Sequence, residues 1–176
     1  MESKKKIFAT LSLGILLFFS FTLICSAANL AISKVQQKQS NWCWAACAEM
    51  VGKWKYGNRS QFQIVTHVKG IAVNESGSAS ETAKGATFAS NYNANFTNGG
   101  RLSLNQVTDI INNNNNPLIA GCAGNSLVGH MFVIHGVSGS DLLICDPKDA
   151  SSKWVNYTIF SNFYGGRSWY ESVYIR

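Results

Sequence analysis

The chain has 176 residues, of which 46% belong to the hydrophobic set and 14% are charged, and its formal net charge is +6. This length suits one domain, and the composition excludes a disordered or highly charged protein. Beyond the first residues, lysines and arginines are scattered singly, so we expect no nucleic-acid partner.

The N-terminus has the organisation of a secretory signal. Met1–Lys6 ends in three lysines, Ile7–Cys25 is almost wholly apolar, and small residues follow at Ser26-Ala27-Ala28. This order is typical of a cleaved export signal. We predict a signal peptide over residues 1–28 and a secreted domain over residues 29–176. The alternative is an uncleaved membrane anchor, since about 19 apolar residues can just cross a bilayer.

The first half of the domain has helical patterns. An apolar stretch without proline follows Asn41 and ends before Gly57, which are ordinary start and stop signals. Further along, serines stand three residues before glutamines, the spacing of a capping box. We predict four helices: Trp42–Tyr56, one after the Ser60–Gln63 box, a weaker one over Ala79–Asn91, and one after the Ser103–Gln106 box.

The second half consists of short apolar segments separated by Gly, Ser, Asn and Asp. Such segments are typical of strands, and Ser138-Gly139-Ser140-Asp141 suits a hairpin turn between two of them. Helices followed by strands predict an α+β fold and not an alternating parallel sheet. The predicted strands are Pro117–Ala123, His130–Val137, Leu142–Asp146, Val155–Phe160 and Ser168–Ile175.

The sequence contains five cysteines, and Cys25 lies in the leader. Cys43 and Cys47 stand one turn apart on one predicted helix, where Cβ atoms are about 5–6 Å apart, too far for a disulfide. Cys122 and Cys145 lie on predicted strands, and either a disulfide or two buried thiols suits an exported protein. No Cys-x-x-Cys pair or zinc-finger spacing is present, so we expect no metal and no other cofactor.

Cys43 differs from the other cysteines because it stands in the first turn of its predicted helix. Unpaired N–H groups and the helix dipole favour a thiolate there. A nucleophilic thiolate also needs a proton shuttle and an oxyanion donor. His130 and Asp146 lie at ends of predicted adjacent antiparallel strands, where Asp146 can orient the imidazole. Gln37, six residues before Cys43, is placed to supply a side-chain amide.

These motifs resemble papain-like cysteine peptidases, in particular the compact bacterial group related to bacteriocin-processing peptidases and secreted papain-like effector peptidases. The resemblance rests on a glutamine six residues before a Trp-Cys-Trp-Ala-Ala helix start, then a Gly-His strand, then Asp-Pro. It spans most of the domain. The matching segments are Gln37–Ala46, Pro117–Ala120, Gly129–Val137 and Cys145–Pro147.

The resemblance implies a papain-like α+β fold, with a helical lobe that carries the nucleophile packed on a C-terminal antiparallel sheet. It implies that Cys43 is the nucleophile, His130 the general base and acid, Asp146 the orienting carboxylate and Gln37 the oxyanion donor. We accordingly expect a monomeric, secreted peptidase that acts on peptide or protein substrates. A membrane is expected as a partner only if the leader is uncleaved.

Each role has competitors of the same residue type. His135 stands five positions from His130, so on a regular strand the two point to opposite faces. Aspartates in turns and loops are usually solvated, which favours Asp146. Spacing favours Gln37 without excluding its neighbours. The competitors are His67 and His135 for the base, Asp141 and Asp149 for the carboxylate, and Gln36 and Gln39 for the oxyanion donor.

Two other functions remain open. The same thioester resolved by an amine would make an amidase or acyltransferase, and an inert Cys43 would leave a non-catalytic binding module or toxin-like protein. The polar composition of the predicted pocket loops, Ala72–Ser80 and Asn91–Gly100, selects no particular substrate side chain.

Overall fold

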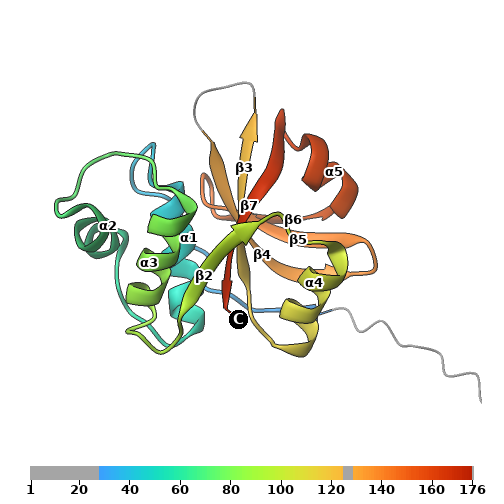
Figure 1. Cartoon of the computed structure of the whole chain (residues 1–176), viewed down its shortest axis with the longest axis horizontal. Helices are drawn as coiled ribbons and strands as arrows, with labels where there is room; N and C mark the ends of the chain where they lie inside the picture. Colours follow the sequence, from blue (N-terminus) through green and yellow to red (C-terminus); the bar gives the residue numbers. More distant parts are fainter. Residues whose placement is uncertain (1–27, 125–128, 176) are drawn as a thin grey trace, which may run out of the picture.

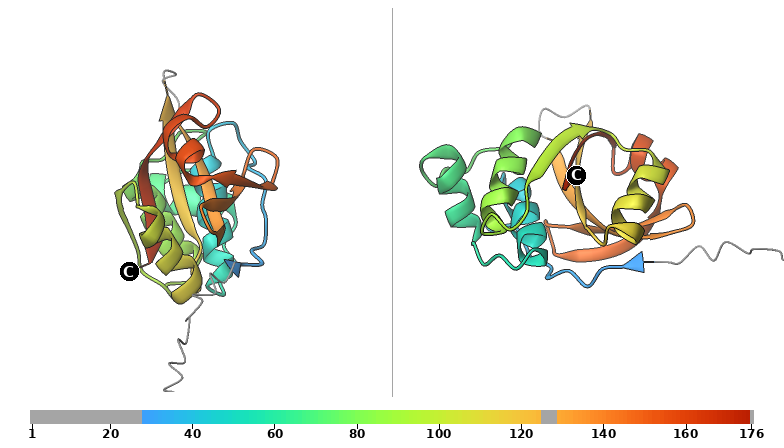
Figure 2. Two further views of the ribbon diagram at one scale, coloured as in Figure 1. Left: turned by 90° about the vertical axis from the view of Figure 1, so that its right-hand side faces the viewer. Right: turned by 60° about the horizontal axis from the view of Figure 1, so that its bottom comes forward.

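The computed structural model describes residues 28–124 and 129–175. Helices α1 (Cys43–Trp54), α2 (Gln61–Lys69) and α3 (Ala79–Ala89) gather at one side of a sheet (Figure 1). The helices α4 (Leu104–Thr108) and α5 (Tyr157–Phe163) lie at its other side, and α4 continues into the π-helical turn η1 (Asp109–Asn113) (Figure 2).

All paired strands form one antiparallel sheet. Its order is β2-β7-β3-β4-β5-β6, and the short β1 pairs separately with β4. The chain's last strand therefore lies between β2 and β3, next to neither β5 nor β6. The strands are β1 (Ala28–Asn29), β2 (Phe96–Gly100), β3 (Leu118–Gly124), β4 (His130–Ser138), β5 (Asp141–Asp146), β6 (Ser151–Asn156) and β7 (Arg167–Ile175).

The predicted helices are all present, and both predicted capping boxes form. The serine side chains of Ser60 and Ser103 each accept a hydrogen bond from the main chain three residues on, and the glutamine side chains bond back. Helix α3 has a third such box, between Ser78 and Glu81. Local side-chain chemistry thus defines the beginning of three helices.

Two predictions about the strands and loops are wrong in part. The predicted strand Val155–Phe160 is divided: β6 ends at Asn156, whose side chain accepts from the Thr158 N–H and begins helix α5. The segment Phe96–Gly100, expected to be loop, is strand β2 and pairs with β7 along its whole length. Its polar, glycine-containing sequence has little strand propensity, so its structure depends on the neighbouring strand.

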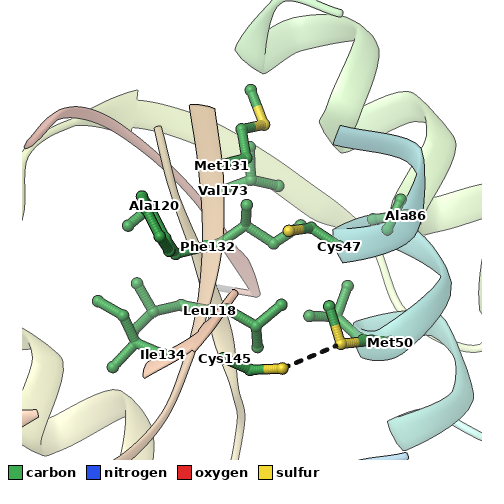
Figure 3. Packing of buried hydrophobic residues seen from close by; sticks show 14 of the residues in the cluster. Cys47, Met50, Ala86, Leu118, Ala120, Met131, Phe132, Ile134, Cys145 and Val173 are labelled. Carbon is green, nitrogen blue, oxygen red and sulfur yellow. Dashed lines mark hydrogen bonds between the residues drawn. The ribbon is translucent and has the colours of Figure 1, made fainter. Parts of the chain in front are cut away.

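The hydrophobic core lies between α1 and the sheet. Cys47 and Met50 of α1 face the sheet, and the Cys145 thiol of β5 donates to Met50 Sδ over 3.7 Å (Figure 3). Met50 is fully buried, as is Trp44 on the same helix. This packing holds the beginning of α1 against the strands that carry the candidate histidine and aspartate.

The predicted signal peptide lies outside the described residues except for Ala28, which pairs with Val137 in β4. Over residues 28–124 and 129–175, no helix has both the length and the apolar character needed to cross a bilayer. The leader and the domain boundary at residue 29 stay predictions.

Candidate active site

Cys43 is the first residue of α1, and no side-chain cap or acidic residue competes for the N–H groups at the beginning of this helix. Its N-cap residue, Trp42, makes no side-chain cap, and the first turn contains no acidic residue. The first backbone N–H groups of a helix have no partner within it, so they and the helix dipole favour a negative charge here. The indoles of Trp42 and Trp44 donate to the carbonyls of Val73 and Glu75, which fixes the helix start against the following loop.

His130 and Asp146 are in direct contact. His130 begins β4, Asp146 ends the antiparallel neighbour β5, and His130 Nε2 lies 2.6 Å from Asp146 Oδ1. The main-chain N–H of Lys148 donates to the same carboxylate oxygen at 2.9 Å, which fixes its orientation. Phe132 packs edge-on against the imidazole, with ring centroids 4.7 Å apart. Since Asp146 occupies Nε2, the other ring nitrogen, Nδ1, is the one left for the Cys43 thiol.

The electrostatics favour a charged imidazole. Burial lowers the pKa of His130, but hydrogen bonds to Asp146 and Cys43, together with their negative charges, raise that pKa to about 9. Burial also acts on Asp146, where it raises the pKa, but the hydrogen bonds from His130 and Lys148 bring the net pKa below its ordinary value. Asp146 is therefore a carboxylate and His130 an imidazolium at neutral pH.

Gln37 lies beside this site, and its side-chain amide is hydrogen-bonded to main-chain carbonyls. Its Nε2 donates to the main-chain carbonyls of Gln39 and Ser40, both at 2.9 Å, while its Oε1 is buried and has no hydrogen-bond partner among the described residues. Its main-chain N–H donates to the Pro147 carbonyl at 2.7 Å, which ties the segment to the turn after Asp146. To act as an oxyanion donor, Nε2 must release one of the two carbonyls.

A buried glutamine that the sequence did not single out holds the Gln37 segment. The side chain of Gln61, fully buried on α2, accepts from the Lys38 N–H and donates to the Gln36 carbonyl, on either side of Gln37. It also donates to Glu49 on α1, which pairs with Lys53. A polar residue opening an otherwise amphipathic helix gave no sign of burial, so only the folded structure identifies this link.

The competing histidines lie elsewhere. His135 is buried, with Nδ1 2.9 Å from the Leu30 carbonyl and Nε2 2.9 Å from the Ser152 hydroxyl, so it joins the N-terminal segment to β6. Burial lowers its pKa. His67 is on the surface and stacks on Phe88, with centroids 4.0 Å apart.

The competing aspartates and glutamines likewise contact other groups. Asp141 begins β5 and accepts from Asn156, and Asp149 accepts from the Ser151 N–H in the next turn. The Gln36 side chain donates to the Lys148 carbonyl, and Gln39 contributes its carbonyl to Gln37. Of these competitors, none has a recorded contact with His130 within the described residues.

A cleft of about 160 Å³ adjoins the thiol. One of the two predicted pocket loops, Ala72–Ser80, contributes to it; the other, Asn91–Gly100, does not, because its end is strand β2. The sequence did not identify the β7 residues on this cleft, Tyr170 and Glu171, because only the order of strands in the sheet brings the last strand beside β3. The lining residues are Cys43, Ser76, Gly77, Gly121, Cys122, Gly129, His130, Met131, Tyr170 and Glu171.

The four described cysteines are free and buried. Cys122 pairs with His130 and Cys145 with Val133, so β4 separates the strands that carry these two cysteines. The sequence left a disulfide between them open, and the structure has none. Cys47 is a core thiol whose pKa is raised by burial. In residues 28–124 and 129–175, no group of three or more His, Cys, Asp or Glu side chains is placed to hold a metal ion.

Known structures share this fold at low sequence identity. The peptidase domain of Streptococcus ComA, a bi-functional ABC transporter involved in a quorum sensing pathway, is 19% identical, with a TM-score of 0.55 over 80% of this chain and 95% of that chain. A putative C39-like peptidase from Bacillus anthracis is 10% identical, with a TM-score of 0.60 over 86% and 98%. UfSP from C. elegans is 10% identical, with a TM-score of 0.58 over 92% and 36%. The predicted papain-like α+β fold is confirmed.

The sequence itself gives the family. No curated protein sequence matches the chain, but the family described as papain-like cysteine protease AvrRpt2 matches residues 26–164. That range contains both α1, where the candidate nucleophile lies, and strands β4 and β5 with the histidine and aspartate. The chain therefore belongs to the papain-like cysteine protease AvrRpt2 family and is a cysteine peptidase.

Proposed function

We propose that the chain is an exported peptidase that hydrolyses peptide bonds through a thioester on Cys43, with His130 and Asp146 as the other members of a catalytic triad. One observation carries the proposal: the His130 imidazole lies 2.6 Å from the Asp146 carboxylate and lines the same cavity as Cys43. A nucleophile, a base and an orienting carboxylate in this order are what acyl transfer requires.

The proposed reaction has two halves. The Cys43 thiolate attacks the substrate carbonyl carbon, and as the C–N bond breaks, the His130 imidazolium gives its proton to the leaving amine. Neutral His130 then takes a proton from water, whose oxygen attacks the thioester and releases the carboxylic acid, which restores the Cys43 thiolate and the His130 imidazolium. Asp146 holds the imidazole with Nε2 toward itself and stabilises its charged form.

The oxyanion formed in each half lies near the beginning of α1. The Cys43 main-chain N–H, at the first helical position, supplies one donor. We assign the second to Gln37, whose amide turns from the carbonyl of Gln39 or Ser40 toward the substrate oxygen.

Export and a monomeric state complete the proposal. The organisation of residues 1–28, with its lysines, apolar stretch and small-residue exit, supports export. The exported protein should begin at Ala28 or Asn29, as measured by intact mass after secretion, and should elute as a monomer in size-exclusion chromatography.

Digestion of an unbiased peptide library tests the chemistry. We expect the parent protein to cleave and Cys43→Ala to be slower by about 10⁴-fold or more, as for other nucleophile deletions. Equal rates would refute the thioester mechanism. An added peptide amine tests acyl transfer: an adduct in place of the free acid would identify an acyltransferase. Iodoacetamide should label Cys43 at mildly acidic pH, whereas an inert thiol would indicate a binding module.

A further inference from the structure

The cleft beside the candidate nucleophile contains one carboxylate. Among its described lining residues, Glu171 of β7 is the only acidic side chain, and most of the others are neutral. Within residues 28–124 and 129–175, no lysine, arginine or histidine forms an ion pair with Glu171, whereas Glu49, Glu81 and Asp146 each have one. The half-buried carboxylate thus faces the cleft without an ion-pair partner in the described chain, because the His130 imidazolium on the same cleft is paired with Asp146.

A bulge in β7 turns this side chain into the cleft. Gly121 of β3 pairs with Glu171, but the next residue, Cys122, pairs with Trp169, so Tyr170 is an extra residue in β7. In a regular strand, neighbouring side chains point to opposite faces. The bulge breaks this alternation and lets both Tyr170 and Glu171 line the same cleft.

Gly121 provides the space in which Glu171 lies. A Cβ atom at position 121 would lie 2.4 Å from Glu171 Cγ and 2.6 Å from Oε1, so any larger residue would displace the carboxylate. The Tyr170 hydroxyl donates to Oε1 at 2.8 Å. Burial, and then the hydrogen bond with Glu171, raise the pKa of Tyr170 to about 12, so the hydroxyl keeps its proton and this bond persists at neutral pH.

We propose that this cleft is a specificity pocket in which the Glu171 carboxylate selects a lysine or arginine side chain next to the scissile bond of the substrate. The proposal rests on the peptidase function proposed above. The cavity, at about 160 Å³, is smaller than ordinary ligand pockets and suits a single side chain. Because Cys43 and Glu171 line the same cavity, the residue that fills it lies within two positions of the attacked carbonyl.

Matched peptides test the selection. They are acetylated at the N-terminus and carry Lys, Arg, Gln or Glu at one position at a time, within two residues of the cleaved bond. The enzymes are the parent, Glu171→Gln, and the control Asp141→Asn, which removes the same charge at the opposite end of β4 and β5. We expect the parent to prefer Lys or Arg over Gln at one position by about tenfold or more in kcat/KM, the worth of one charged hydrogen bond.

The variants decide the outcome. Glu171→Gln should remove the preference, so that its kcat/KM values for the Lys, Arg and Gln peptides become similar, and Asp141→Asn should keep it. A Lys-to-Gln ratio that is unchanged in Glu171→Gln would overturn the proposal. So would a dependence on Glu171 seen only with unacetylated peptides, because the selected cation would then be the substrate's amino terminus.

A second measurement does not need peptide cleavage, so it separates this proposal from the peptidase mechanism. The reagents are a cationic trimethylammonium-ethyl methanethiosulfonate and a neutral methyl methanethiosulfonate, and the rate of each with Cys43 is divided by its rate with a free thiol. This normalised rate should be several-fold higher for the cationic reagent, and Glu171→Gln should abolish the difference. The difference should also shrink in 1 M salt. Equal relative rates in the parent and Glu171→Gln would overturn the electrostatic selection even if the parent cleaves peptides.

Discussion

Replacing Asp146 by asparagine should move the alkaline limit of activity downward. Asparagine keeps a carbonyl oxygen near His130 Nε2 but removes the negative charge. In the parent, burial lowers the His130 pKa, while Asp146 and Cys43 together raise it from 6.5 to about 9. That shift corresponds to about 3 kcal/mol in favour of the imidazolium, shared between the two partners. Loss of the Asp146 charge should therefore lower the His130 pKa by about one to two units.

The pH dependence of kcat/KM measures this change. If the thiolate–imidazolium pair is the reactive form, activity falls as His130 loses its proton, so we expect an alkaline limb near pH 9 in the parent and near pH 7–8 in Asp146→Asn. Asp149→Asn is the control, because this fully exposed aspartate caps Ser151 and has no recorded contact with His130. An alkaline limb that stays near pH 9 in Asp146→Asn would refute the role of Asp146.

The charged form of His130, which Asp146 stabilises, should also make the free energy of unfolding depend on pH. Because the pKa of His130 is raised in the folded protein, its contribution is complete below the unfolded pKa of about 6.5 and is lost as pH rises through about 9. The free energy of unfolding of the parent should fall by up to about 3 kcal/mol over this interval, and less in Asp146→Asn. Urea denaturation at pH 6, 7.5 and 9.5 measures the free energy of unfolding of both proteins. The same dependence on pH in the parent and in Asp146→Asn would contradict the ion pair.

Three further substitutions test the surroundings of the site. Gln61→Met, which removes the hydrogen bonds of Gln61 with the Lys38 N–H and with Glu49, should cost about 1–3 kcal/mol in urea denaturation, and no loss would contradict the network. Gln37→Ala should lower kcat by about 10²–10³-fold with KM little changed; an unchanged kcat would exclude it as oxyanion donor. Gly77→Ala places a Cβ 2.4 Å from the Trp44 ring and should cost about 1–3 kcal/mol in the same assay.

Local signals in the sequence predicted the helical lobe well. The capping boxes at Ser60 and Ser103 form because a serine and a glutamine three residues apart satisfy one another's main-chain groups without help from the rest of the fold. The beginning of α1 at Cys43 is local in the same sense, with no Pro or Gly to interrupt its first turns. The strands were harder to predict, since β6 gives way to α5 at Asn156, a cap that the apolar pattern concealed.

The long-range part of the site was predicted only where a motif supported it. His130 and Asp146 stand at the ends of strands joined by a short turn, so their contact depends on a single antiparallel pairing that the sequence indicates. Gln61 has no such signal, because its importance comes from three partners distributed over α1 and the segment before it. Buried polar networks of this kind depend on tertiary packing, which periodicity does not reveal.

The position of Glu171 in the cleft follows from the sequence only when the sheet topology is known. Glu171 is the only acidic residue after Asp149, within a strand that mixes aromatic, apolar and polar residues, and by itself that pattern is equally consistent with a solvated strand face. Strand alternation alone cannot place both Glu171 and its neighbour Tyr170 in one cleft. The extra residue in β7 opposite Gly121 makes this arrangement possible. Nucleophile and proposed selector thus come from opposite ends of the domain, and the sheet order that inserts β7 beside β3 brings them into one cavity.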